Sequence, residues 1–279
     1  DNMSIKNKIK KVINFLLKEE HRTTVIVKKA DPSCLLKGKR VIITGGNRGL
    51  GFEIAKKCIE EKAEVLIVGR NECSLKETSN ILNCEYAVCD ISNIKSVEKF
   101  FENISKYFNG NKVDCLINNA GVYAFNVNNF HDVTEKIWDD LFNVNLKGSY
   151  FMTKYFVEYL EKQNVDKGNI VIVSSERAIA ADDTPYGITK AGVNSFVKGF
   201  AINIIEKGYR INGVAPSVMA TDMGLHKKDD NLYSESLRGK RIFLPEEIAE
   251  VVIFLLSDIS GSISGEIIAC NQGNYIKEK

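Results

Sequence analysis

A tyrosine and a lysine four residues apart are the side chains of this sequence best suited to moving a proton. Tyr186 and Lys190 stand in the segment Tyr-Gly-Ile-Thr-Lys, and this spacing puts them on one face of a helix. A free phenol, with a pKa of about 10, accepts a proton poorly at neutral pH. A neighbouring ammonium stabilises the phenolate and lowers that pKa, so the pair predicts an acid–base at Tyr186. The same spacing is common on helix surfaces, so the interpretation depends on the rest of the chain.

A glycine-rich turn at residues 44–51 is the second chemical signal. The apolar run Val41–Ile43 leads into Thr-Gly-Gly-Asn-Arg-Gly-Leu-Gly, and apolar residues at helical spacing follow from Phe52 to Ile59. Glycines allow a sharp turn and a close approach to a pyrophosphate, whose charge the amides and dipole of a helix N-terminus favour. No Gly-Lys-Ser/Thr sequence is present, so a nucleoside triphosphate loop is not expected. The turn therefore predicts a dinucleotide site.

Two arginines bear on which dinucleotide is bound. A carboxylate at the end of the second strand would accept hydrogen bonds from a ribose 2′-hydroxyl and repel a 2′-phosphate. This chain has Gly69-Arg70-Asn71 there, and Arg48 lies inside the glycine turn. Guanidinium groups bind phosphate well, so we expect NADP(H) rather than NAD(H). The alternative is that both are ordinary surface arginines.

Apolar segments alternate with segments of helical period from residue 39 onward. Near-continuous Val and Ile runs separated by helices predict a parallel sheet covered on both faces. We therefore expect an α/β fold, a single doubly wound parallel sheet of the Rossmann-like kind, with its ligand at the carboxyl ends of the strands. The expected strands are 40–44, 64–68, 85–89, 113–117, 168–173, 209–214 and 266–269, and the expected helices lie near 50–62, 95–107, 134–161, 186–207 and 245–256.

The N-terminal segment differs in charge from the rest of the chain. Residues 1–40 hold eleven Lys and Arg against four Asp and Glu, a net of +7, whereas the remainder carries −5. Residues 4–20 show apolar side chains at helical spacing with lysines between them. We expect residues 1–36 to form a basic arm with an amphipathic helix, and residues 37–279 to form the Rossmann-like domain. The helix could pack on its own domain, on a partner subunit or on a membrane surface, and no nucleic-acid motif accompanies it.

The composition is that of a globular protein with a sizeable core, since 44% of the residues are apolar, 27% are charged and the net charge is +2. No apolar run approaches the ~20 residues needed to span a bilayer, and no secretory signal is visible. The seven cysteines include no Cys-x-x-Cys pair and no cluster with histidine. We therefore expect free thiols, no metal site and a cytoplasmic location.

Taken together, these segments resemble the short-chain dehydrogenase/reductase family over roughly residues 38–275. The glycine turn fits the family's Thr-Gly-x-x-x-Gly-x-Gly pattern, and Tyr186 with Lys190 fits its Tyr-x-x-x-Lys pattern. The motifs are short, but they stand in the family's order. The others are Cys89-Asp90-Ile91-Ser92, Asn118-Asn119-Ala120-Gly121, Asn145, Ser174-Ser175 and Asn212-Gly213-Val214-Ala215-Pro216.

The resemblance assigns a role to each catalytic side chain. Tyr186 would exchange a proton with the substrate oxygen, which Ser175 would polarise. Lys190 would also hold the nicotinamide ribose, and Asn145 would support a water-linked proton path through that lysine. The implied cofactor-binding residues are Gly45, Asn47, Arg48, Gly49, Leu50, Gly51, Arg70, Asp90, Ile91, Asn119, Ala120, Gly121, Tyr186, Lys190, Pro216, Val218 and Thr221.

Two departures from the family pattern concern the substrate side. Ser175 lies eleven residues before Tyr186 and Ser174 lies twelve, which is two and one short of the family's usual spacing. Position at the strand end favours Ser175, with a connecting loop shortened by two, and Ser174 is the alternative. Ser217 stands where the family usually has glycine after Pro216, and we expect it to shift the following loop.

The substrate pocket is the least determined part of the sequence. Tyr123 and Phe125 follow the Asn-Asn-Ala-Gly motif and could line the pocket or simply pack in the core. Residues 222–240 are short and polar, as expected of a solvated flap, and selection of an anionic or acyl-carrier substrate is the alternative. Steroid, retinoid, sugar, quinone-like and acyl substrates all stay open.

We expect an oxidoreductase that transfers a hydride between NADP(H) and a small-molecule carbonyl or alcohol substrate. The alternative of a different class is a non-catalytic NADPH-binding regulator on the same fold. A sugar-nucleotide epimerase or dehydratase is disfavoured, because such relatives usually carry a larger C-terminal substrate domain. By analogy with relatives, helices 144–161 and 186–207 would pack across a two-fold axis in a homodimer or homotetramer.

Overall fold

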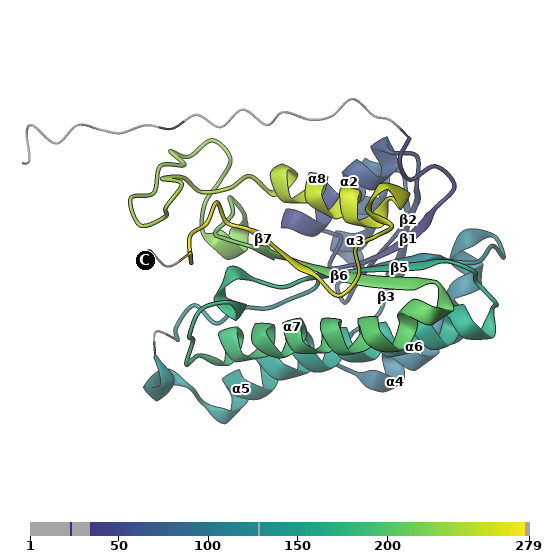
Figure 1. The fold of residues 1–279 in the computed structure, drawn as a ribbon, viewed down its shortest axis with the longest axis horizontal. Coiled ribbons are helices and arrows are strands. Elements are labelled where there is room, and N and C mark those ends of the chain that lie inside the picture. The colour runs from purple at the N-terminus through teal and green to yellow at the C-terminus, as the bar shows by residue number, and fades with distance from the viewer. Residues whose placement is uncertain (1–22, 24–33, 128, 277–279) are drawn as a thin grey trace, which may run out of the picture.

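The structure is a computed structural model in which residues 23, 34–127 and 129–276 are described. Nearly all of the basic arm, including its expected amphipathic helix at residues 4–20, lies outside the described residues. Figure 1 shows the rest as helices on either side of a twisted sheet.

The described residues hold one sheet of seven parallel strands in the order β3-β2-β1-β4-β5-β6-β7. This is the doubly wound arrangement expected from the sequence, with the order reversing between β1 and β4. At the centre, Ile42 of β1 is in register with Leu66 of β2 on one side and Leu116 of β4 on the other. The strands are β1 (Arg40–Thr44), β2 (Glu64–Gly69), β3 (Glu85–Val88), β4 (Cys115–Asn118), β5 (Gly168–Val173), β6 (Tyr209–Pro216) and β7 (Ile267–Cys270).

Helices cover both faces of the sheet, and each face has its own apolar core. One core joins alternate strand residues to α4, α6 and α7, with Phe156 among its largest buried side chains. The other joins the opposite strand residues to α2, α3 and α8. Figure 1 shows the two layers, with α2 and α8 on one side of the strands and α6 and α7 on the other. The helices are α2 (Gly49–Glu60), α3 (Glu72–Leu82), α4 (Ile94–Glu102), α5 (Glu135–Leu141), α6 (Ser149–Lys162), α7 (Pro185–Ile204) and α8 (Pro245–Leu256).

Shorter helical turns join these elements, and one of them matters for the site. The segment expected as one helix over 134–161 consists of α5, a π-helical segment η3 (Phe142–Gly148) and α6. A π-helix is rare and often marks a functional position, and this one carries Asn145. The other short segments, all 3₁₀ turns, are η1 (Ile104–Phe108), η2 (Phe130–Asp132), η4 (Glu176–Ala178), η5 (Ile205–Lys207), η6 (Asp222–Gly224) and η7 (Asp258–Ser260).

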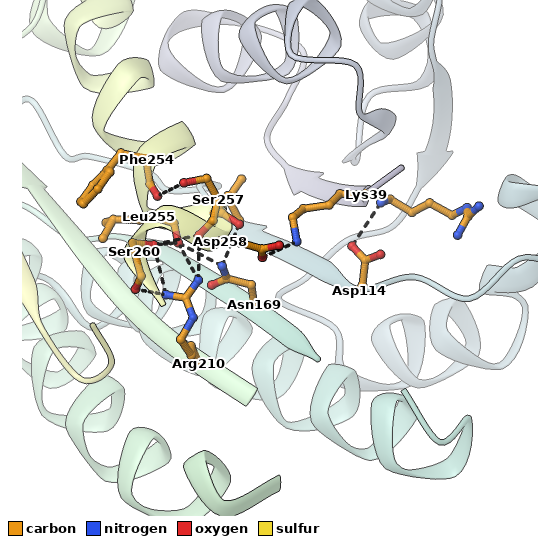
Figure 2. A network of polar contacts seen from close by, with 11 residues as sticks. Lys39, Asp114, Asn169, Arg210, Phe254, Leu255, Ser257, Asp258 and Ser260 are labelled. Carbon is orange, nitrogen blue, oxygen red and sulfur yellow. Dashed lines mark hydrogen bonds and ion pairs between the residues drawn. The ribbon is translucent and has the colours of Figure 1, made fainter. Parts of the chain in front are cut away.

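A polar network joins the end of α8 to the N-terminal ends of the strands (Figure 2). The Arg210 guanidinium, at the start of β6, donates to the carbonyls of Leu255, Ser257, Ser260 and Ile263. Leu255 lies in the last turn of α8, whose carbonyls have no partner within the helix, and the other three carbonyls follow the helix. The Asn169 amide donates to the carbonyls of Leu255 and Leu256 at 2.9 Å, and Lys39 pairs with Asp258. The contacts at the N-terminal ends of the strands therefore stabilise the fold. The candidate site lies at the other end of the sheet, at the carboxyl ends of the strands.

Three observations bear on the expectations from composition. No helix among the described residues is long and apolar enough to cross a membrane. In the same part of the chain, no group of three or more His, Cys, Asp and Glu side chains could hold a metal ion. Each of the seven cysteines has a free thiol, as expected.

Candidate functional site

The glycine turn lies at the carboxyl end of β1, and its geometry admits little besides glycine. A Cβ on Gly51 would stand 2.1 Å from the carbonyl oxygen of Gly45, so a side chain there would displace the turn. Gly49 has φ +54°, and a Cβ on it would lie 3.6 Å from Cγ2 of Thr221. Leu50 packs inward, in the core between α2 and the sheet. The turn thus brings the backbone at the start of α2 next to Thr221.

The Asn119 side chain is hydrogen-bonded to the backbone of this turn. Its side-chain Nδ2 donates to the carbonyls of Thr44 and Gly45 at 3.0 Å. The Thr44 hydroxyl accepts hydrogen bonds from the amides of Asn119 and Ala120, both at 3.1 Å. The end of β4 is thereby bonded to the end of β1, and Ala120 and Gly121 continue from it along the site.

The helix α3, which the sequence analysis did not predict, holds the other side of the turn. Nδ2 of Asn47 donates to the Ser74 hydroxyl at 2.8 Å, and the Thr78 hydroxyl donates to the Asn47 carbonyl at 3.0 Å. Asn71 caps α3 by accepting from the Ser74 amide at 3.0 Å. Ser74 therefore joins the site, and the signal for it was the Asn-Glu-Cys-Ser sequence of a helix cap after β2.

Arg48 and Arg70 come from neighbouring loops and are both exposed. Oδ1 of Asn47 lies 3.5 Å from where a Cβ on Gly69 would stand, so the residues just before the two arginines are in contact. Within the described part of the chain neither guanidinium has a hydrogen bond or an ion pair. The end of β2 carries no carboxylate that would repel a phosphate.

Asp90 and Ile91 follow the carboxyl end of β3. Oδ1 of Asp90 accepts from the amide of Ser92 at 3.0 Å and from its hydroxyl at 2.7 Å, so the aspartate closes the turn before α4. Ile91 is buried, and its carbonyl lies 2.9 Å from where a Cβ on Gly148 would stand. This contact fixes the segment against the start of α6.

Tyr186 lies in the first turn of α7, beside Ser175 at the end of β5. The Ser175 side chain lies close enough to the Tyr186 phenol to affect its pKa, and its hydroxyl accepts from the Arg177 amide at 3.2 Å. The Ser174 hydroxyl instead donates to Oδ1 of Asn194 at 2.6 Å. The geometry thus brings Ser175, and not Ser174, to the phenol, and it supports the shortened loop.

Lys190 is buried one turn along α7 from Tyr186. Its ammonium donates to the carbonyl of Val173 at 2.8 Å and lies 5.8 Å from the centre of the Tyr186 ring. Burial lowers the pKa of Lys190 to about 8. Burial also raises the pKa of Tyr186, and the Ser175 hydroxyl and the positive charge of Arg177 oppose that rise. Arg177 is therefore a cation near the phenol besides the expected Lys190, whose ammonium is bonded to a main-chain carbonyl.

Asn145 is buried and clamps the chain that follows β4. Oδ1 accepts from the Val122 amide at 2.8 Å, and Nδ2 donates to the Val122 carbonyl at 3.0 Å and to the Thr189 hydroxyl at 3.4 Å. A Cβ on Gly121 would lie 3.4 Å from Oδ1 of Asn145 and 3.8 Å from Nζ of Lys190. Gly121, Asn145 and Lys190 therefore meet around one small space.

Aromatic rings form the wall on the substrate side. The Tyr123 ring packs edge-on against Tyr186, with centroids 4.9 Å apart, and against Phe125 at 5.2 Å. Phe125 is 54% exposed, so it does not pack in the core. Beside these rings lies a small hollow lined by Tyr123, Ala124, Val127, Leu141, Thr184, Pro185 and Tyr186.

The loop after Pro216 is bonded to a carboxylate that the sequence analysis missed. The Ser217 hydroxyl donates to Oε1 of the buried Glu176 at 2.6 Å, and Nδ2 of Asn274 donates to Oε2 at 3.2 Å. Val218 accepts at its carbonyl from the Phe243 amide at 3.0 Å. Ser217, which stands in place of the family's usual glycine, is thus bonded to Glu176. This substitution was the sequence signal from which a hydrogen-bond partner for residue 217 could have been inferred.

The expected flap over 222–240 is better anchored than a free solvated loop. Leu232 and Leu237 are buried in a small apolar cluster with Ala220, Ile242 and Leu244. The Lys228 ammonium pairs with Glu53 of α2 and Glu246 of α8. Most of residues 222–240 are exposed, as expected of a solvated flap, and Leu232 and Leu237 anchor it to this cluster.

Comparison with known proteins agrees with this geometry. A family model described as enoyl-(acyl carrier protein) reductase matches residues 45–274. The chain is 31% identical over 250 residues to the 3-oxoacyl-(acyl-carrier-protein) reductase FabG of Aquifex aeolicus, covering 86% of this chain and 98% of that protein. It is 29% identical over 249 residues to dehydrogenase/reductase SDR family member 4 of Homo sapiens, covering 85% and 88%. The crystal structure of a short chain dehydrogenase from Mycobacterium smegmatis matches with a TM-score of 0.74 at 30% identity, covering 88% of this chain and 97% of that one. The glycine turn, the hydrogen bonds of Asn145 and the position of Tyr186 agree with these likenesses. The chain therefore belongs to the short-chain dehydrogenase/reductase family of oxidoreductases.

Proposed function

We propose that this protein is an NADP(H)-dependent carbonyl reductase, or in the reverse direction an alcohol dehydrogenase, for a small-molecule substrate. The observation that carries the proposal is that Ser175 lies beside the Tyr186 phenol, with the buried ammonium of Lys190 5.8 Å from the centre of the Tyr186 ring. These three side chains stand at the same edge of the sheet as the glycine turn. A phenol positioned with a hydroxyl beside a dinucleotide site suits proton exchange with an oxygen that gains or loses a hydride.

The chemistry of the glycine turn fits a dinucleotide. No side chain caps α2 and no acidic residue stands in its first turn, so its first amides and its dipole are available to phosphate. A bound nicotinamide would supply or accept the hydride. The residues that would hold the dinucleotide are those named from the sequence: Gly45, Asn47, Arg48, Gly49, Leu50, Gly51, Arg70, Asp90, Ile91, Asn119, Ala120, Gly121, Tyr186, Lys190, Pro216, Val218 and Thr221.

Preference for NADP(H) is supported by the two exposed guanidiniums of Arg48 and Arg70. Their loops touch through Asn47 and Gly69, and neither arginine has a partner within the described residues. Two free cations on one edge favour a 2′-phosphate, and guanidinium binds phosphate in a bidentate geometry. Ser74, bonded to Asn47, adds a hydroxyl donor at the same edge.

In the proposed reaction each side chain has a separate task. The Ser175 hydroxyl donates a hydrogen bond to the substrate oxygen and polarises it. Tyr186 gives its proton to that oxygen during carbonyl reduction and takes it back during alcohol oxidation. A protonated Lys190 favours the phenolate and so assists the proton transfer. Asn145 holds Val122 and contacts Thr189, which keeps the residues around Lys190 in place.

The test is NADPH oxidation followed at 340 nm with a panel of aldehydes, ketones and 3-oxoacyl thioesters. Tyr186→Phe should bind NADPH as the wild type does and lose carbonyl reduction by roughly 10²–10⁴-fold, the usual contribution of a positioned acid–base. Near-normal turnover in that variant would contradict the proposed mechanism. Cofactor binding without turnover of any panel member in the wild type would instead favour the regulatory alternative.

We also propose that the protein is a homodimer or homotetramer formed across α6 and α7. Tyr150, Phe196 and Phe200 pack edge-to-face on these helices at 5.3–5.9 Å, and Tyr150 is 41% exposed. Aromatic side chains are enriched in the cores of protein interfaces. Light scattering at micromolar concentration should give two or four times the monomer mass, and a monomer would contradict the proposal.

A further inference from the structure

The shortened loop between β5 and α7 is organised around one side chain, Arg177. Its amide donates to the Ser175 hydroxyl at 3.2 Å. Its guanidinium donates to the Tyr123 hydroxyl at 3.1 Å and to the Thr184 hydroxyl at 3.4 Å, and its Nε donates to Asp182. One residue is therefore bonded to the substrate-polarising serine, the pocket wall and the N-cap of the helix that carries Tyr186.

Asp182 holds Arg177 from the other side, and the Tyr-x-x-x-Lys segment makes room for it. The Asp182 side chain is 6% exposed, against 34% for that of Arg177. It also accepts from the Thr184 amide at 2.9 Å and from its hydroxyl at 2.7 Å. A Cβ on Gly187 would lie 2.2 Å from Cγ of Asp182, so the glycine after Tyr186 lets the loop pack on the first turn of α7. The ion pair is thus built into the fold of the loop.

The groups around the phenol of Tyr186 come from three parts of the chain. Arg177 and Asp182 face it from the short loop, Tyr123 faces it from the segment after β4, and Lys190 lies along its own helix. Burial raises the pKa of Tyr186, the positive charge of Arg177 lowers it, and Tyr123 and Asp182 act against the arginine. Tyr275, from the C-terminal segment, lies close enough to Arg177 and Asp182 for their charges to affect its own pKa.

We infer that Arg177 is a positioning residue of this site, which fixes Ser175 and Tyr123 against Tyr186 and supplies positive charge that favours the ionised phenol. The inference rests on the proposed function for its consequence on catalysis, but not for its consequence on the phenol. It assigns to the short loop a task that the family pattern gives to Lys190 alone. Since the cation is paired with Asp182, its effect is smaller than that of a free charge at the same place.

The experiment titrates the Tyr186 phenol directly, by the chemical shift of ¹³Cζ-labelled tyrosine, with no cofactor or substrate present. Tyr186→Phe assigns the signal. Arg177→Gln should move the titration midpoint of Tyr186 to higher pH, and Arg177→Lys, which keeps the charge, should restore most of the difference. Tyr123→Phe, which removes the contact but leaves the cation, should change the midpoint little.

Where the wild type turns over a carbonyl substrate, the same variants have a kinetic signature. Arg177→Gln should lower kcat for alcohol oxidation at pH 7 about three- to tenfold, because one pKa unit corresponds to a tenfold change. Its pH profile should shift upward, and the Kd for NADPH should not change. An unmoved Tyr186 midpoint in Arg177→Gln, with wild-type circular dichroism and NADPH affinity, would overturn the inference. Absence of turnover in the wild type would overturn the proposed function and leave the titration to decide on Arg177.

Discussion

Replacing Lys190 with methionine should stabilise the protein at neutral pH and remove a pH dependence that the wild type shows between about pH 8 and 10.5. The reason is that the lysine is buried, with a single hydrogen bond from its ammonium to the Val173 carbonyl, and burial lowers its pKa to about 8. A methionine of similar length fills the space and has no charge to desolvate.

The sign follows from proton binding in the two states. Below pH 8 the lysine is protonated in both the folded and the unfolded chain, so its titration adds no pH dependence. Between about pH 8 and the ordinary value of 10.5, the unfolded chain is protonated and the folded one is not. The free energy of unfolding therefore rises with pH there, by about 3 kcal/mol over the window. At pH 7 the variant is spared this charging cost and loses a hydrogen bond worth about 1 kcal/mol, which leaves a net gain of about 2 kcal/mol.

Urea unfolding at pH 7 and pH 10 measures both quantities, in the wild type, Lys190→Met and Lys198→Met. Lys198 is exposed on the same helix, so its variant controls for loss of a lysine without burial. Cysteines and tyrosines that titrate in this range contribute equally to the three proteins and cancel in the comparison. An equal change in stability from pH 7 to 10 in all three would refute the reasoning, since it would mean that the Lys190 ammonium is solvated or paired in solution.

Two further predictions concern the cofactor and the fold. The double variant with Arg48→Ala and Arg70→Ala should weaken NADPH binding at least tenfold, by loss of two charge-assisted contacts, and leave NADH binding nearly unchanged in a fluorescence titration. An equal loss for both dinucleotides would contradict the assignment of these arginines. Arg210→Met should lower the free energy of unfolding by about 2–4 kcal/mol, because it removes the charge-assisted hydrogen bonds that join β6 to the segment after α8. Urea midpoints within error of the wild type would show that water replaces the guanidinium there.

The sheet was predictable because its strands are buried on both faces. The run Val41–Ile43 of β1, for example, has apolar side chains on both faces of the sheet. A short continuous apolar run between turn residues is typical of a buried strand. The strand ends moved by a few residues at most, as between the expected 209–214 and the observed Tyr209–Pro216. Strand boundaries depend on pairing with neighbours, which a sequence pattern does not contain.

Two helical segments could not be predicted from the apolar periodicity. The polar helix α3 buries only Leu75 and Thr78, so it has almost no apolar stripe to read. Its cap, Asn71 bonded to Ser74, was the better signal. The π-helical segment that carries Asn145 interrupts a sequence whose apolar spacing continues without a break, so one long helix was the natural prediction. The hydrogen bonds from Asn145 in this segment to Val122 are tertiary contacts, which the periodic pattern does not contain.

The site could be predicted as a set of residues but not as a set of charges. Tyr186, Lys190, Ser175 and Asn145 were placed at one edge by motifs, and the structure brings them together. Arg177, whose positive charge lowers the pKa of Tyr186 while burial raises it, was not predicted. Arg177 reaches Tyr123 and Thr184 only because the loop is short enough to fold back on α7, and no spacing rule states that.

The two departures from the family pattern meet at one buried carboxylate. Glu176 directly follows Ser175 and is buried, and a buried carboxylate needs donors for both of its oxygens. A glycine after Pro216 would offer no side-chain donor, whereas Ser217 supplies one at 2.6 Å and Asn274 from the C-terminal segment supplies the other. Glu176, the residue after Pro216 and the C-terminal turn are therefore joined by hydrogen bonds, and loss of either donor would leave one oxygen of the Glu176 carboxylate without a partner beside Ser175.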